Sequence, residues 1–218
     1  TASVTPSARL NSIVDSAVKQ TASKFSAKGV KTDNLAVTVI DLSDADKLQS
    51  GSFRGEEKIF PASVVKMFYM VALHQWLENG KTKLTPEIER AMKDMVVDSS
   101  NEATQFLLDV LTDTSSGSEL SEKELAKWGF KRNIVNRYFS SLNYQNINVN
   151  QKTFCEGAYG REKQFRGKDN INHNKLTTNA AARLMSEIAL RKAVSTKRSE
   201  QMLELMKRDW DGNTSRPF

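Results

Sequence analysis

The first periodic feature of the chain is an apolar stripe with helical spacing, made by Leu10, Ile13, Val14, Ala17, Val18 and Phe25. Gly29 follows the stripe and predicts the end of this helix. The segment 35–42 is rich in β-branched residues and precedes Ser43 and Asp44, which is typical of a buried strand that ends in a turn. A second strand over 48–53 completes a predicted hairpin.

From Pro61 onward the pattern is that of helices. We expect a largely buried helix from Pro61 to about Leu77, and Thr85 with Pro86 supplies a cap and a first turn for the next one. The remaining helices are predicted over 86–97, 101–111, 121–129, 133–142, 178–190 and 196–207. Residues 143–174 show no sustained period, so we expect a long irregular loop of the kind that is usually functional or mobile.

Ser63-Val64-Val65-Lys66 places a hydroxyl and an amine three residues apart, on one face of the predicted helix. A serine needs a base to become a nucleophile, and a lysine among apolar neighbours loses its charge more readily. The spacing alone is weak, because Ser16-Ala17-Val18-Lys19 repeats it. Ser16 lies in the middle of a plain amphipathic helix, whereas Ser63 follows a hairpin and Pro61, so we predict that Ser63 is the nucleophile.

A second polar group lies between two predicted helices, where Ser99-Ser100-Asn101 offers a hydroxyl and an amide. The hydroxyl of Ser99 is able to relay a proton, and the amide of Asn101 is able to hold a substrate amide. Ser141-Leu142-Asn143 has the same form, so this triplet is not specific by itself. Ser100 is also expected to cap the following helix.

Composition narrows the function classes. Hydrophobic residues make up 39% of the chain and charged residues 27%, which excludes the disordered and membrane-spanning classes. The net charge is +6, but Lys and Arg are scattered among Asp and Glu without a basic, aromatic-rich run, so we predict no nucleic-acid partner. The single cysteine, Cys155, and the isolated histidines His74 and His173 give no metal-ligand spacing, and we predict neither metal nor organic cofactor.

The segment Arg54 to Lys66 resembles the approach to the catalytic helix of class A β-lactamases and their penicillin-binding relatives. Ser99-Ser100-Asn101 resembles that family's Ser-Asp-Asn segment, with Ser100 in place of the aspartate, and Leu176 to Ala181 resembles its return from the omega loop. The resemblance implies that Ser63 is acylated, that Lys66 is its base or relay, that Ser99 passes a proton to the leaving nitrogen, and that Asn101 binds the substrate amide.

Two features of that family are missing here. Its omega loop carries a glutamate followed four residues later by asparagine, a pair that activates the deacylating water, and no such pair occurs between Asn150 and Asn174. Glu156 and Glu162 are the candidates for a base in a changed loop, although a solvated loop charge is the simpler interpretation of both. The family's Lys-Thr-Gly or Lys-Ser-Gly triplet is also absent, and we expect the strand that carries it to lie in a C-terminal remainder of the protein.

The resemblance implies an α+β fold of two regions, in which an all-α region packs against helices and an antiparallel sheet whose C-terminal strands are missing from this chain. Residues 1–60 are expected to supply a helix and two strands, residues 61–190 the all-α region with the motifs and an omega-like loop, and residues 191–218 a return helix.

The implied reaction is acyl transfer from a β-lactam or a D-alanyl-D-alanine peptide to Ser63, with slow deacylation, in a periplasmic or other extracytoplasmic location. The alternatives are a true β-lactamase with a relocated glutamate and a non-catalytic binding domain of the same fold.

Overall fold

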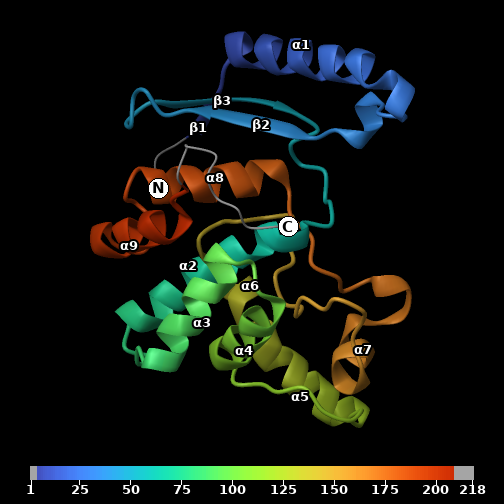
Figure 1. The fold of residues 1–218 in the computed structure, drawn as a ribbon, viewed down its shortest axis with the longest axis vertical. Coiled ribbons are helices and arrows are strands. Elements are labelled where there is room, and N and C mark those ends of the chain that lie inside the picture. The colour runs from blue at the N-terminus through green and yellow to red at the C-terminus, as the bar shows by residue number, and fades with distance from the viewer. Residues whose placement is uncertain (1–3, 209–218) are drawn as a thin grey trace.

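The computed structural model describes residues 4–208 and has three layers, in which a small sheet lies between one helix and a group of packed helices (Figure 1). Helix α1 (Ala8–Lys24) covers one face of the sheet, and α8 (Thr178–Ala189) lies on the opposite side, against strand β2. The remaining helices lie on the side of α8 that faces away from the sheet (Figure 1). Residues 1–3 of the predicted segment 1–60 and residues 209–218 of the predicted segment 191–218 lie outside the described residues.

The predicted hairpin is present as β2 (Val37–Asp41) paired antiparallel with β3 (Leu48–Phe53). A third strand, β1 (Val4–Pro6), pairs parallel with β3, and the sequence pattern, which indicated two strands in this region, did not predict it. Three residues are too few to show an alternating pattern. Gly51 on β3 has no room for a side chain, since a Cβ there would lie 2.4 Å from the carbonyl carbon of Leu10, and this glycine lets α1 rest directly on the sheet.

The helical region begins with the 3₁₀ turn η3 (Ala62–Val64) and α2 (Val65–Glu78). Helix α2 lies at the centre of the core, with ten of its residues buried, as its nearly continuous apolar sequence predicts. Around it pack α3 (Pro86–Val97), α4 (Asn101–Thr112), α6 (Ile134–Ser141) and α9 (Thr196–Met206). Each of these begins or ends within a few residues of its predicted bounds. The other 3₁₀ turns among the described residues are η1 (Ser26–Lys28), η2 (Thr32–Asn34) and η4 (Lys168–Asn170).

Helix α5 (Glu122–Arg132) starts at the predicted capping box of Ser121 and Glu124 but runs past the predicted end at Gly129. Gly129 lies inside the helix because the ring of Phe165 packs on it, and a Cβ there would lie 2.6 Å from that ring. The glycine therefore serves the packing of α5 against α7 rather than the end of the helix.

The predicted irregular segment 143–174 contains one further helix, α7 (Gly160–Arg166). The apolar period misses it because the helix has seven residues and its one fully buried side chain is the carboxylate of Glu162. The rest of the segment connects α6 to α8 and passes over the start of α4 (Figure 1).

Candidate active site

Ser63 is exposed in the 3₁₀ turn that leads into α2, and the backbone around it is tightly fixed. Ile59 and Leu176 exchange two backbone hydrogen bonds of 2.9 and 3.0 Å, which tie the approach to Ser63 to the segment before α8. Ala62 has a φ of 44°, in the left-handed region that residues with a side chain rarely adopt. Such conformations cost about 1–3 kcal/mol each and are concentrated at functional sites.

Lys66 is 4% exposed, and its amine connects the two predicted motifs. Its Nζ donates to the backbone carbonyl and, at 3.0 Å, to the Oγ of Ser99, and it donates to Asn101 Oδ1 at 3.0 Å. Ser99 Oγ in turn donates to Ser63 Oγ at 3.0 Å. The structure thus brings Ser63, Lys66, Ser99 and Asn101 together, with Ser99 placed between the amine and Ser63.

The conformation of Ser99 explains how it reaches both partners. Ser99 has a φ of 54° and lies between α3 and α4, where its carbonyl and its hydroxyl both face Lys66. The next residue, Ser100, caps α4 as predicted, because its Oγ accepts a hydrogen bond from the Ala103 N–H at 3.1 Å. The two adjacent serines therefore have separate tasks: one faces the amine and the other starts the helix.

The electrostatic surroundings of Lys66 favour loss of its proton. Burial lowers the pKa of the Lys66 amine, and this outweighs the electrostatic influence of Glu102 and Cys155, which acts in the opposite direction. An amine with a lowered pKa is neutral, and so able to accept a proton, in a larger fraction of molecules near neutral pH.

The loop over residues 150–157 lies beside the amide of Asn101. Asn101 Nδ2 donates to Cys155 Sγ at 3.3 Å, and Gln105 Nε2 donates to the carbonyl of Thr153 at 2.9 Å. Both donors belong to α4, so this helix holds the loop next to the predicted nucleophile.

Two hollows open beside Ser63. One has a volume of about 530 Å³ and is bordered by Ser63, Lys66 and Ser99 together with the side chains of Met67, Met70, Met95, Met185 and Met206. The other has a volume of about 320 Å³ and is bordered by Ser63, Asn101 and the loop residues Lys152 to Phe154 and Glu156. Ser63 is thus accessible from two sides, one apolar and rich in methionine, the other polar.

The two candidate bases of the loop differ in position. Glu156 is exposed and borders the 320 Å³ hollow that Ser63 also borders. Glu162 is 1% exposed, and its Oε1 accepts from Arg132 Nη2 at 2.7 Å and from Ser116 Oγ at 3.0 Å. The interpretation of Glu162 as a solvated loop charge was therefore wrong, since its carboxylate belongs to a buried ionic cluster.

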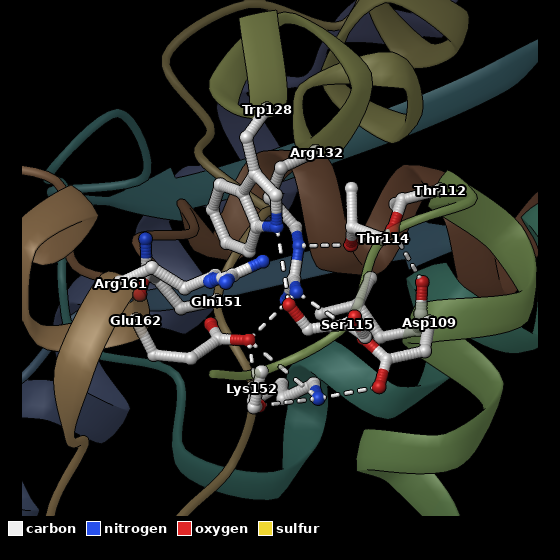
Figure 2. A network of polar contacts seen from close by, with 12 residues as sticks. Asp109, Thr112, Thr114, Ser115, Trp128, Arg132, Gln151, Lys152, Arg161 and Glu162 are labelled. Carbon is white, nitrogen blue, oxygen red and sulfur yellow. Dashed lines mark hydrogen bonds and ion pairs between the residues drawn. The ribbon is translucent and has the colours of Figure 1, made fainter. Parts of the chain in front are cut away.

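This ionic cluster contains Asp109, Arg132, Lys152 and Glu162 and joins α4, α5, the loop and α7 (Figure 2). Lys152 Nζ lies 2.6 Å from Asp109 Oδ2 and 3.5 Å from Glu162 Oε1. Two cations and two carboxylates balance one another here, and three of the four side chains are almost fully buried, whereas that of Asp109 is 28% exposed. The cluster fixes the loop at Lys152, next to the hollow at Ser63.

The competing pair, Ser16 and Lys19, lies on α1 with both side chains exposed, and Ser16 Oγ accepts a hydrogen bond from Gln20 at 3.1 Å. Sequence reasoning gave no role to Lys152, Thr153 or Arg166 and considered His173 only as a metal ligand, whereas all four border the polar hollow. Their common signal was a cluster of polar residues in a segment without a period, which is visible in the sequence but does not show which of them meet.

Within residues 4–208 no group of three or more His, Cys, Asp or Glu side chains is placed to hold a metal ion. No helix in that part of the chain is both long and apolar enough to cross a membrane.

Comparison with known proteins gives one family. A sequence model described as the beta-lactamase enzyme family matches residues 17–216. This range contains both predicted motifs and all the described helices apart from the first turns of α1. No curated protein matches the chain.

Proposed function

The chain belongs to the beta-lactamase enzyme family, and from this premise we propose that Ser63 is the nucleophile of a serine hydrolase that forms an acyl-enzyme with β-lactams or with D-alanyl-D-alanine peptides. The observation that carries the proposal is the continuous contact from Lys66 Nζ through Ser99 Oγ to Ser63 Oγ, with 3.0 Å at each step. A nucleophile, a relay and a base within hydrogen-bond reach form the arrangement that acyl transfer to serine needs.

The proton has a defined path. When Lys66 is neutral, Ser99 gives its hydroxyl proton to Lys66 Nζ and accepts the proton of Ser63. The Ser63 oxygen then attacks the carbonyl carbon of the substrate amide. When the tetrahedral intermediate collapses, the carbon–nitrogen bond breaks and Ser99 passes the proton from Lys66 to the leaving nitrogen. Ser63 ends as an ester and the amine is free, so the atoms and the proton balance.

The start of α2 supplies part of the stabilisation of the oxyanion. Amide N–H groups in the first turn of a helix have no partner within the helix and carry the positive end of its dipole. Ser63 lies in the turn that begins this helix. Its own amide is therefore suited to the negative charge that develops on the substrate carbonyl oxygen.

Asn101 is suited to the amide of the acyl side chain. Its Oδ1 is taken by Lys66, whereas its Nδ2 donates to the weak acceptor Cys155 Sγ at 3.3 Å. A substrate carbonyl is a stronger acceptor than sulfur and would replace it.

Slow deacylation is supported by the loop. Hydrolysis of the ester needs a water held by a base, and general-base assistance contributes about 10² to 10⁴ in rate. Glu162 is committed to Arg132 and Ser116 in the ionic cluster, and the glutamate and asparagine pair of the family is missing. We therefore favour a penicillin-binding, peptidase-like enzyme, acting on cell-wall peptides outside the cytoplasm.

A true β-lactamase is the second candidate, and the position of Glu156 favours it, because this carboxylate borders the same hollow as Ser63. A non-catalytic binding domain is disfavoured by the intact contact of Lys66, Ser99 and Ser63.

Mass spectrometry of the whole protein after incubation with a penicillin tests the proposal. We expect one adduct of the full mass of the penicillin, located by peptide mapping at Ser63 and lost in Ser63→Ala. The Ser16→Ala variant is the matched control and should be labelled like the parent. An unmodified Ser63 under conditions that label a known penicillin-binding enzyme would refute the proposal.

A further inference from the structure

The polar hollow beside Ser63 contains more unpaired polar groups than the acylation reaction uses. It has a volume of about 320 Å³, which is at the lower end of the range for small-molecule sites. Thr153 Oγ1, Arg166 Nε and His173 Nδ1 belong to residues that border it, and each of these atoms is buried without a hydrogen-bond partner. Buried polar atoms are rarely left unpaired, because each costs about 1–3 kcal/mol, so three such atoms in residues that border one hollow point to an occupant that gives them partners.

The charged side chains around the hollow differ in whether they have an oppositely charged partner. Lys152 is held by Asp109 and Glu162, so its charge is already neutralised. Among the described residues, Arg166 forms no ion pair with a carboxylate, and its guanidinium lies 5.7 Å from the centre of the Phe154 ring. Glu156 is the one carboxylate among the described residues that border the hollow, and it is exposed to solvent. Among the charged side chains that border the hollow, the half-buried one without an opposite charge is therefore the cation Arg166.

His173 borders the same hollow as Arg166 and is able to donate a hydrogen bond there without adding a second positive charge. Burial and the positive charge of Arg166 lower the pKa of the His173 imidazole, so the ring is neutral at neutral pH. A neutral imidazole with its proton on Nδ1 is a donor, as are Arg166 Nε and the hydroxyl of Thr153. The ring is held at its edge by Phe60, with centroids 4.4 Å apart. All three residues border the same hollow, and a set of donors there suits a group that only accepts hydrogen bonds.

The residues that border each hollow indicate which half of the substrate, the acyl group or the leaving group, lies there. Ser99, which hands the proton to the leaving nitrogen, borders the methionine-rich hollow and not the polar one. Asn101, which holds the amide of the acyl side chain, borders the polar hollow and not the other. The polar hollow is therefore on the acyl side of Ser63.

We infer that the polar hollow is a carboxylate-binding subsite, in which Arg166, His173 and Thr153 recognise an anionic carboxylate on the acyl side chain of the substrate. The inference rests on the proposed function and deepens it, since it names the class of acyl group that the enzyme selects. Aromatic rings of Phe60 and Phe154 border the same hollow and accommodate the carbon skeleton that carries the carboxylate.

Equilibrium binding to the full chain carrying Ser63→Ala tests the subsite apart from acylation. The probes are a penicillin with a phenylacetyl side chain and its derivative with a carboxyl on the α-carbon of that side chain, which differ by one carboxylate. Titration calorimetry should show roughly ten- to hundredfold tighter binding of the carboxylated penicillin, as a charge-assisted hydrogen bond provides. Arg166→Gln should remove this preference, and Thr153→Val should reduce it.

Lys163→Gln is the matched control, because it removes the same charge from an exposed position of the same helix and should keep the preference. Equal affinity for the two penicillins, no measurable binding of the carboxylated one, or a preference that survives both Arg166→Gln and Thr153→Val would overturn the subsite. If Arg166→Gln is unfolded by circular dichroism, Thr153→Val decides, since its hydroxyl has no partner to lose. Acylation of the parent chain is measured in parallel: its absence with the preference retained would refute the proposed function and leave the subsite standing.

Discussion

Arg132 on α5 and Glu162 on α7 form an ion pair of 2.7 Å in which the two side chains are 0% and 1% exposed. Thirty positions of sequence separate them, and their contact fastens α7 and the loop before it to the helical region (Figure 2). Removing one partner of a buried pair leaves the other charge without compensation, which is far more costly than the pair itself is stabilising.

The first prediction concerns this pair. Glu162→Gln should lower the free energy of unfolding by about 3–5 kcal/mol, because Arg132 and Lys152 are then left with Asp109 alone. Urea unfolding of the variant and the parent measures the difference. Glu156→Gln removes the same charge from an exposed position of the same loop and should stay within about 0.5 kcal/mol of the parent. Equal stabilities of the two variants would contradict the structural role of the cluster.

The second prediction separates the two adjacent serines. Ser99→Ala removes the hydroxyl between Lys66 and Ser63, so acylation by a penicillin should slow by about 10² to 10⁴ with little change in stability. Ser100→Ala removes the cap of α4 and should cost about 1 kcal/mol of stability while acylation is retained. Stopped-flow acylation and urea unfolding of both variants are the measurements, and a Ser99→Ala enzyme as fast as the parent would exclude the relay.

The third prediction concerns pH. Because burial lowers the pKa of Lys66 and only the neutral amine accepts a proton, the acylation rate should rise with pH and level off below the ordinary titration range of lysine. The charge of Glu102 opposes this lowering, so Glu102→Gln should shift the profile toward lower pH. Glu122→Gln, at an exposed position at the start of α5, is the control and should leave the profile in place. A shift toward higher pH would contradict the assigned role of Lys66.

The parts of the fold that follow from local rules could be predicted from the sequence. The capping box of Ser121 and Glu124 starts α5, and Thr85 with Pro86 starts α3, because caps act on residues three or four positions away. Helix α7 could not be predicted in this way, since its buried side chain is Glu162 and its partner Arg132 is far along the chain. The spacing of apolar residues does not predict a helix whose buried side chain is charged and forms an ion pair.

The candidate site also has a part that local spacing predicts and a part that depends on contacts between distant segments. The spacing of Ser63 and Lys66 places them on one helical face, but it does not show that Ser99 lies between them. That contact depends on the left-handed backbone of Ser99, and only the resemblance to the family indicated it beforehand. The polar hollow depends on Arg166 and His173, which meet through the path of a loop that no local rule describes.

The last prediction is the rate of turnover, which distinguishes the two enzymatic candidates. Acylation needs Ser63, the relay and an oxyanion hole, whereas hydrolysis of the ester also needs a water with a base at hand. Because Glu162 is held by Arg132 and Ser116, we expect it to give no such help, and we expect a long-lived penicilloyl-enzyme with slow hydrolysis of nitrocefin. Glu156→Gln should then change the slow turnover less than about twofold, far below the 10² to 10⁴ that a general base contributes.

Pre-steady-state kinetics of the parent and of Glu156→Gln carry this comparison, with the amplitude of the acylation burst as the count of active enzyme. A burst followed by a slow steady state, equal in both proteins, is the expected result. Fast turnover in the parent that is lost in Glu156→Gln, with the burst retained, would mean that Glu156 holds the water in the hollow beside Ser63. The protein would then be a β-lactamase with its base at a new place in the loop, and the peptidase-like assignment would be wrong.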